Sequence, residues 1–415
     1  MNILWISFYG SWTLPLLKEI NKNNNGKTAI IAPIIGGRKK IREVKDGIIF
    51  YSLPFNRKEL FQNMTLNTFQ KFNEVINEFN PDIIHVHGTE KNLGQIQSFI
   101  SHIPIVISIQ GIISACRPFY LNYLEKNEVR RFTTIKNLLG RGGIERTRKI
   151  FENGDKYETH IIREGKYFFT RTLWDYAHVT LENPNAQIFK GEEILREQFY
   201  RNAKTWNLSS FEKYRIFMPS GADPLKGLHH AIKVLALLKK DFPQIKLVVP
   251  GLKYNHIHQN RIKDFLFGEE YMRYIKKLIK NYAIQDNIIL LNRLEAREMV
   301  EEMKKANVFL SPSSIDNSPN AVGEAMMIGT PIVTTPVGGI PSFMKDEINC
   351  LFASAGDPYI MAYQIRRIFE NENLARLLSN NATEKAQVRH SIETITKQYI
   401  DTYLLLIKRH EGTII

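Results

Sequence analysis

The 415-residue sequence has little cysteine and no long apolar run. Its two cysteines, Cys116 and Cys350, are too few for a disulfide framework or a conventional zinc site, which fits a reduced cytoplasmic setting. The first residues lack the basic and apolar regions of a signal peptide. The longest apolar candidate, Ile103 to Ala115, is interrupted by polar residues and falls short of the roughly 18 residues that span a bilayer. We therefore expect a cytoplasmic protein.

Three motifs of other chemistries are also missing. Neither half of the chain has a G-x-G-x-x-G after its first strand, which disfavours a dinucleotide-binding enzyme. No Asp-x-Asp occurs, so we expect neither a metal nor another cofactor. The usual nucleic-acid recognition motifs are absent, and despite a net charge of +14 we expect no nucleic-acid partner.

The patterns that are present indicate an α/β protein of two domains. A chain of 415 residues is too long for one ordinary core, and strand-like runs alternate with amphipathic helices from end to end. We predict one domain at residues 1–195, a second at 196–390, and a final helix within 391–415. The predicted strands are Ile3–Phe8, Thr28–Pro33, Ile48–Leu53, Asp82–His87, Ile105–Ile109, Lys166–Thr170, Arg215–Met218, Lys246–Val249, Asn287–Leu291, Val308–Leu310 and Pro331–Thr334. The predicted helices include Leu60–Phe79, Asn92–His102, Leu228–Lys240, Glu269–Tyr282, Arg297–Ala306 and Ser391–His410.

The stretch from Asp316 to Gly339, DNSPNAVGEAMMIGTPIVTTPVGG, is the most informative. Ser318-Pro319 predicts a helix entry with serine as the N-cap, and a short apolar helix follows, with Glu324 as its acidic residue. Backbone N–H groups at such a helix start can bind a phosphate. We expect Asn320, Ala321 and Val322 to supply them, and Glu324 to accept hydrogen bonds from sugar hydroxyls.

The same stretch resembles the acidic-x7-Glu signature of the family-4, retaining glycosyltransferases, with Asp316 and Glu324 as the acidic pair and G-T-P-I-V-T-T-P-V-G-G downstream. The family usually has Glu at the first position. The resemblance implies the GT-B fold, in which two Rossmann-like domains face each other across a cleft. It also implies a nucleotide-diphosphate sugar as donor, held by the second domain, an acceptor held by the first domain, and a final helix that returns to the first domain.

A second element, SGADPLKGLHHAIKVL, follows a predicted strand and resembles the family's Gly-Arg-x-x-x-x-Lys-Gly motif. Lys226 stands where the family's diphosphate-binding lysine belongs, which makes Asp316, Glu324 and Lys226 the catalytic candidates. Gly221, also a donor-site candidate, occupies the position of the family's arginine. We expect Arg171 or Arg293 to replace that cation.

The first half offers weaker candidates for the acceptor side of the cleft. Gly10 follows the first strand, where the family has a glycine loop, and Gln110 replaces a family histidine. His87 ends the strand PDIIHVHG; we expect it and His85 to alternate in direction, so that at most one faces the cleft. Arg171 completes this group.

Several histidines elsewhere could suggest a metal, namely the pair His229-His230 and the pair His256 and His258. No cysteine or carboxylate framework accompanies them, so we expect surface residues.

A basic stretch from Lys126 to Lys149 has eight Lys/Arg against two acidic residues, with Phe132, Ile135, Leu138 and Leu139 between them. It reads equally well as a segment that lies on an anionic membrane surface and as a solvated insertion. The first reading favours a lipid-linked acceptor and a peripheral position on the inner face of the membrane.

The resemblance thus implies a metal-independent, retaining glycosyltransferase that acts on a glycan or lipid-linked acceptor in bacterial surface-polysaccharide biosynthesis, such as that of capsule. A nucleotide-sugar 2-epimerase on the same fold is an alternative, which requires acids or bases in the cleft. A catalytically silent nucleotide-sugar-binding subunit is another, because Gly221 and Gln110 stand where the family has arginine and histidine.

Overall fold

The computed structural model describes residues 1–8, 13–139, 142–252 and 269–412. The chain divides into two compact units. The first comprises Met1–Arg117, Ile150–Leu195 and His390–Ile415; the second comprises Pro118–Lys149 and Arg196–Arg389. The basic insertion therefore belongs to the second unit, although the strands that flank it in the sequence, β6 (Ile105–Ser108) and β7 (Tyr167–Thr170), belong to the first. No pattern in the sequence indicated this.

The first unit is built on a mostly parallel sheet that has eight strands among the described residues, in the order β3-β4-β2-β1-β5-β6-β7-β8. Only the β3–β4 pair among these is antiparallel. Its strands are β1 (Ile3–Ile6), β2 (Thr28–Ile35), β3 (Ile41–Lys45), β4 (Ile48–Phe55), β5 (Ile83–His87), β6 (Ile105–Ser108), β7 (Tyr167–Thr170) and β8 (Gln187–Lys190). The central strands β1, β5, β6 and β7 are buried along their whole length, as expected for a parallel sheet covered on both faces.

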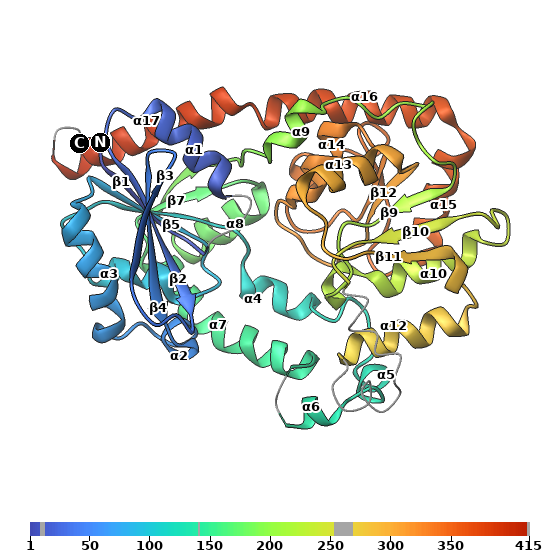
Figure 1. The fold of residues 1–415 in the computed structure, drawn as a ribbon, viewed down its shortest axis with the longest axis horizontal. Coiled ribbons are helices and arrows are strands. Elements are labelled where there is room, and N and C mark those ends of the chain that lie inside the picture. Colours follow the sequence, from blue (N-terminus) through green and yellow to red (C-terminus); the bar gives the residue numbers. More distant parts are fainter. Residues whose placement is uncertain (9–12, 140–141, 253–268, 413–415) are drawn as a thin grey trace. The chain divides into compact units, whose positions relative to one another are not determined.

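Helices cover this sheet. They are α1 (Thr13–Asn23), α2 (Arg57–Leu60), α3 (Leu66–Phe79), α4 (Ile113–Cys116), most of α7 (Ile144–Glu164), α8 (Leu173–Glu182) and α17 (Ile392–His410). The C-terminal helix α17 packs on α1 and β5, and Figure 1 shows α1 and α17 side by side. Its Tyr403 hydroxyl lies 2.6 Å from Nδ1 of His85 in β5, which ties the end of the chain into the first unit.

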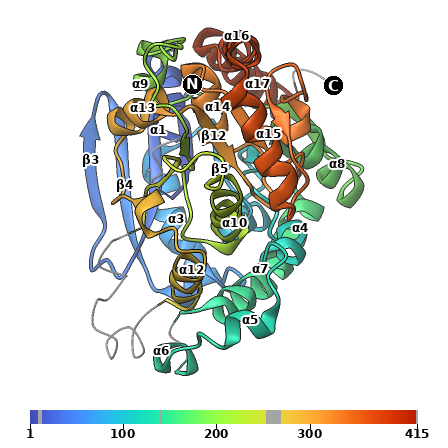
Figure 2. The same cartoon turned by 90° about the vertical axis from the view of Figure 1, so that its right-hand side faces the viewer.

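The second unit has a parallel sheet with six strands among the described residues, in the order β11-β10-β9-β12-β13-β14. The strands are β9 (Arg215–Phe217), β10 (Lys246–Val249), β11 (Ile288–Leu290), β12 (Val308–Ser311), β13 (Ile332–Thr334) and β14 (Leu351–Phe352). The helices are α5 (Lys126–Arg130), α6 (Ile135–Leu138), α9 (Glu197–Arg201), α10 (Leu228–Leu238), α12 (Glu270–Asn281), α13 (Ala296–Lys305), α14 (Asn320–Ile328), α15 (Pro358–Glu370) and α16 (Glu372–Arg389). Figure 2 shows α10 and α12 lying next to each other.

The predicted α/β class is confirmed, and most predicted strands exist within two residues of their expected ends. Two predicted helices differ from the structure. The segment that starts at Asn92 is a 3₁₀ helix that ends at Ser98, and the helix predicted at Leu60–Phe79 begins only at Leu66. The strands β3, β8 and β14 were not predicted. No helix in the described part of the chain is long and apolar enough to cross a membrane.

The basic insertion is broken into short helices and is anchored to α12. Glu270 accepts hydrogen bonds from Thr133 Oγ1 at 3.0 Å and from the Ile144 N–H at 3.1 Å. Arg273 donates to the Phe132 carbonyl at 2.7 Å. These bonds hold the insertion as a fixed part of the second unit.

Candidate functional site

A pocket of about 170 Å³ lies in the second unit, where β9 and β12 end and α14 begins. Its lining residues are Arg196, Met218, Pro219, Ser220, Lys226, Met299, Leu310, Ser311, Pro312, Ser313, Asp316, Pro319, Ala321, Val322 and Glu324. The carboxyl ends of neighbouring parallel strands are the common position for ligand sites in such sheets. This pocket brings together five of the predicted donor-site residues: Lys226, Asp316, Ala321, Val322 and Glu324.

Lys226 is presented by a tight turn after β9. Asp223 caps a 3₁₀ helix (Pro224–Lys226) by accepting a hydrogen bond from the Leu225 N–H at 3.1 Å. Gly227 follows with a φ of 79°, and a Cβ there would lie 2.3 Å from the Pro312 carbonyl oxygen. The glycine of the Lys-Gly pair is therefore required by the close approach of this turn to the loop after β12.

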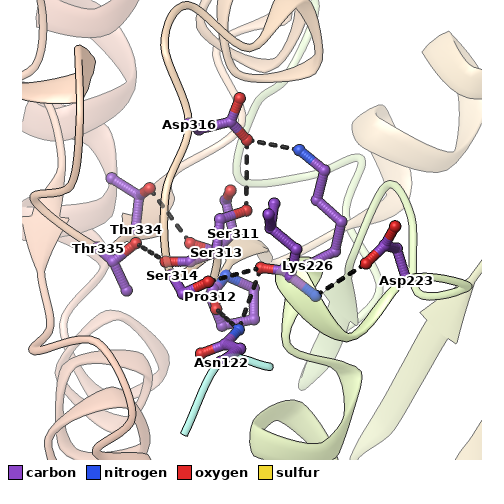
Figure 3. A network of polar contacts seen from close by, with 11 residues as sticks. Asn122, Asp223, Lys226, Ser311, Pro312, Ser313, Ser314, Asp316, Thr334 and Thr335 are labelled. Atoms are coloured by element: carbon purple, nitrogen blue, oxygen red, sulfur yellow. Dashed lines mark hydrogen bonds and ion pairs between the residues drawn. The ribbon is translucent and has the colours of Figure 1, made fainter. Parts of the chain in front are cut away.

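Asp316 lies on that loop, which is held from several sides (Figure 3). The Thr335 hydroxyl donates to the Ser313 carbonyl at 2.6 Å, and the Gly339 N–H donates to the Asp316 carbonyl at 2.9 Å. The Asp316 carboxylate lies 2.6 Å from Lys226 Nζ and 3.4 Å from the Ser313 hydroxyl. The predicted acid and the predicted lysine thus form a direct ion pair.

Asn122, from the segment Pro118–Lys149 that contains the basic insertion, joins the two loops from beneath (Figure 3). Its side-chain amide donates to the carbonyls of Leu225 at 3.1 Å and Pro312 at 3.2 Å, and its side chain is buried. Its own carbonyl lies 2.9 Å from Nε2 of both His229 and His230. The residue fixes the distance between the Lys226 turn and the Asp316 loop, and nothing in the sequence pattern singled it out.

The prediction that His229 and His230 are surface residues is wrong. Both are buried, with exposures of 0% and 3%, because they lie in the first turn of α10 beneath Asn122. Burial lowers the pKa of His230 to about 4, so its ring is neutral near pH 7. Their role is to hold the insertion, while His256 and His258 lie outside the described residues.

The N-cap of helix α14 lies one residue later than predicted. Pro319, rather than Ser318, is the N-cap, and Ser318 instead accepts a hydrogen bond from Arg389 at 2.8 Å. The N–H of Val322 donates to the Pro319 carbonyl, so of the three N–H groups expected to bind a phosphate, those of Asn320 and Ala321 precede the first bond within the helix. Asn320 is half-buried and does not line the pocket.

Glu324 is buried in the pocket wall and held by a residue that the sequence did not reveal. Arg196 donates from Nε and Nη2 to the two Glu324 carboxylate oxygens at 2.7 and 2.8 Å. Burial raises the pKa of Glu324, although the bonds from Arg196 act in the opposite direction. In the sequence, Arg196 stands at the start of the predicted second domain, and no motif singled it out.

Neither expected replacement for the family's arginine lies in this pocket. Arg293 follows β11 and is exposed. Arg171 belongs to the first unit, where it forms a buried ion pair with Glu193 at 2.8 Å. Gly221 packs against the sheet, since a Cβ there would lie 2.9 Å from both Leu228 and Val249.

The first unit gathers His87, Gln110 and Arg171 around a small cavity of about 10 Å³, with Glu193 and Tyr399 among its other lining residues. Arg171 donates to the Gln110 carbonyl at 2.6 Å. Burial, and then the charge of Arg171, lowers the pKa of His87 to about 3. Such a ring is too weak a base to remove a proton from an acceptor near pH 7. Gly10 lies outside the described residues.

The expectation that His85 and His87 alternate in direction is wrong. Residues two apart on a strand point to the same face, and the two ring centroids lie 4.0 Å apart, both against Trp5. His85 is fully buried and bonded to Ser108 and Tyr403. The pair is part of the packing beneath the cavity.

Comparison with known proteins gives relatives for most of the chain. Residues 199–385 match the family described as glycosyl transferases group 1. The putative glycosyltransferase YtcC of Bacillus subtilis is 23% identical over 369 residues, 87% of this chain and 79% of that protein. The capsular polysaccharide biosynthesis glycosyltransferase CapM of Staphylococcus aureus is 22% identical over 189 residues, 45% of each chain. Two uncharacterized glycosyltransferases of Methanocaldococcus jannaschii are matched over only 39% and 32% of their own length.

Solved structures resemble the whole chain. Sucrose-phosphate synthase from Thermosynechococcus elongatus has a TM-score of 0.72 at 17% identity, with 99% of this chain and 100% of that chain covered. Anabaena HepE, solved in complex with UDP-glucose, has a TM-score of 0.64 at 15% identity, with 97% and 99% covered. At these identities the likeness concerns the fold, which is the predicted GT-B type.

Proposed function

We propose that this chain is a glycosyltransferase that transfers a sugar from a nucleotide-diphosphate donor bound in the pocket of the second unit, because its residues 199–385 match the group 1 glycosyl transferases. The observation that carries the proposal is the convergence of Lys226, Asp316, Glu324 and the start of α14 on one pocket within the matched residues. The comparisons do not favour the epimerase or the silent binding subunit.

In the proposed reaction the bond between the anomeric carbon and the donor diphosphate breaks. Lys226 Nζ and the first N–H groups of α14 stabilise the negative charge that develops on the diphosphate. The acceptor hydroxyl forms the new glycosidic bond on the same face of the sugar, and its proton passes to an oxygen of the leaving diphosphate. Asp316 binds the transferred sugar, and Glu324 accepts hydrogen bonds from hydroxyls of the donor. In this proposal, neither the breaking of the donor bond nor the formation of the new glycosidic bond requires a metal ion.

For the donor, we favour a uridine nucleotide, because the HepE neighbour was solved with UDP-glucose. For the acceptor, we propose a glycan or lipid-linked intermediate of surface polysaccharide, since CapM is named for capsular polysaccharide biosynthesis. The first unit, with the cavity beside His87, Gln110 and Arg171, is the proposed acceptor-binding part. The protein would act in the cytoplasm.

We further propose that the basic insertion rests on an anionic membrane. Leu138 and Leu139 are 78% and 69% exposed, and Ile135 is 40% exposed, among basic residues of the same segment. Exposed apolar side chains beside cations are typical of a helix that binds at an anionic lipid surface. A position on the inner face of the membrane would bring the enzyme to a lipid-linked acceptor.

The donor proposal is tested by thermal shift with UDP-glucose, UDP-galactose, UDP-N-acetylglucosamine, GDP-mannose and ADP-glucose. A donor that binds only the native state raises the melting temperature. Lys226→Ala should lose that rise, whereas Lys385→Ala, an exposed lysine on α16, should keep it. A wild-type protein that none of these sugars stabilises, or a Lys226→Ala variant with the full shift, would contradict the proposal.

A further inference from the structure

The charged side chains that line the pocket of the second unit sum to no net charge, and this affects how the pocket can bind a diphosphate. Among the described residues that line it, the charged side chains are Lys226, Arg196, Asp316 and Glu324. They form two ion pairs, Lys226 with Asp316 and Arg196 with Glu324. A diphosphate that enters a site with no net positive charge must obtain its cationic contacts from these same side chains.

The turn before Lys226 has no room for another cation. Gly221 is buried, and a Cβ at this position would lie 2.9 Å from side-chain atoms of Leu228 and Val249. An arginine at position 221 would require both neighbours to shift. A second phosphate-binding cation must therefore come from another element.

Arg196 meets the geometric requirement. It engages Glu324 side-on through Nε and Nη2, and no hydrogen bond from Nη1 occurs to any residue that the structure describes. Its side chain is 23% exposed and lines the pocket, whereas that of Glu324 is 5% exposed. The guanidinium is also fixed by the Phe199 ring, whose centroid lies 4.9 Å away.

We propose that Arg196 is a second donor-binding residue: it keeps Glu324 through Nε and Nη2 and donates from Nη1 to a phosphate oxygen of the nucleotide. A planar guanidinium can bind a carboxylate on one edge and an anion on the other, which a lysine cannot do. The inference rests on the proposed function of the pocket and names the cation that replaces the one missing at Gly221. Arg196 would then contact both Glu324, which binds donor hydroxyls, and the diphosphate that leaves.

The alternative role for Arg196 is to position Glu324 only, and the two roles differ in what they do to phosphate binding. Replacing Arg196 alone would leave a buried carboxylate without its partner. The comparison is therefore made in a Glu324→Gln background, where Arg196→Gln pairs two neutral amides. Arg201→Gln is the matched control, because Arg201 lies on α9, is exposed and pairs only with Glu197 among the described residues.

The experiment measures the dissociation constants of UDP and uridine by calorimetry or competition, for wild type, Glu324→Gln, the Arg196→Gln/Glu324→Gln double variant and Arg201→Gln. Circular dichroism and melting temperature confirm that each variant folds. Adding Arg196→Gln to Glu324→Gln should weaken UDP binding about tenfold or more while changing uridine binding less than twofold, as expected for the loss of a charge-assisted hydrogen bond.

Equal weakening of UDP and uridine would overturn the inference and leave Arg196 as a positioning residue, and so would no weakening of either. A wild-type protein that does not bind UDP would instead overturn the proposed function of the pocket with its uridine donor, and the inference with it. If the wild type binds UDP, but the ratio of the UDP and uridine dissociation constants is the same in the double variant as in Glu324→Gln, the inference alone would be overturned.

Discussion

The ion pair between Lys226 and Asp316 makes a prediction that separates donor binding from transfer. The Asp316 carboxylate lies 2.6 Å from Lys226 Nζ, and the two side chains are 16% and 33% exposed. If Lys226 binds the donor diphosphate, the phosphate oxygens come close to a carboxylate that already uses the same cation. Asp316→Asn should therefore strengthen the binding of UDP, although it removes an acidic residue of the proposed site.

The size of the effect follows from the distance. A phosphate against Lys226 would lie about 5 Å from the Asp316 carboxylate, where two unit charges repel by about 0.8 kcal/mol in water and about 3 kcal/mol at an effective dielectric constant near 20. The pocket is open to solvent, so we expect about 1 kcal/mol, which corresponds to roughly fivefold tighter binding.

Isothermal calorimetry with UDP checks this, and Asp286→Asn serves as a control because Asp286 is an exposed acid of the same unit. Turnover of the donor identified by thermal shift should fall in Asp316→Asn, since Asp316 is proposed to bind the transferred sugar. Weaker UDP binding in Asp316→Asn, or binding unchanged from wild type, would refute the idea that Lys226 is shared between the carboxylate and the diphosphate.

Three further predictions concern the elements around the site. Asn122→Ala removes hydrogen bonds to two loops, so it should lower the free energy of unfolding of the second unit by about 1–3 kcal/mol and weaken UDP binding. Hydrogen exchange measures the first effect and calorimetry the second, with Asn292→Ala, at an exposed position, as the control. Wild-type values for both would contradict the role given to Asn122. His230 has a pKa of about 4 in the folded protein against 6.5 when exposed, so as the pH falls the unfolded chain binds the proton first. The contribution of His230 to stability should therefore be full above pH 6.5 and decline toward pH 4. His230→Gln should make the melting temperature depend less on pH over this range, and an unchanged dependence would be the contrary result. Leu138→Asn should reduce the fraction of the protein that floats with phosphatidylglycerol vesicles. Leu181→Asn should not, although Leu181, on α8, is 83% exposed. Equal flotation of the two variants would argue against the membrane proposal.

Residues whose role depends on their neighbours in sequence were predictable. The strand Lys246–Val249 was predicted with its observed ends, because a buried parallel strand is a continuous apolar run. The apolar helix with Glu324 and the Lys-Gly turn were predicted because proline and glycine mark the ends of such elements. In contrast, β3 was missed, since it is an exposed edge strand whose residues, IREVK, show no buried face.

Residues whose role depends on distant contacts were not predictable. Arg196 is one charged residue among many in the sequence, and its role becomes visible only through its contact with Glu324, 128 residues away. The burial of His229 and His230 depends on Asn122, which lies in an insertion of the other half of the sequence. Periodicity reports which face of an element is apolar, but it does not report which remote segment covers that face.

The central claim is that the pocket at Lys226, Asp316 and α14 binds the donor diphosphate. Hydrogen exchange measured with and without saturating UDP tests it most directly, because the method locates the protected amides. The account predicts protection of the turn at residues 223–227 and of the loop and helix start at residues 313–322, and loss of that protection in Lys226→Ala. Saturation by UDP with protection confined to other segments would contradict it.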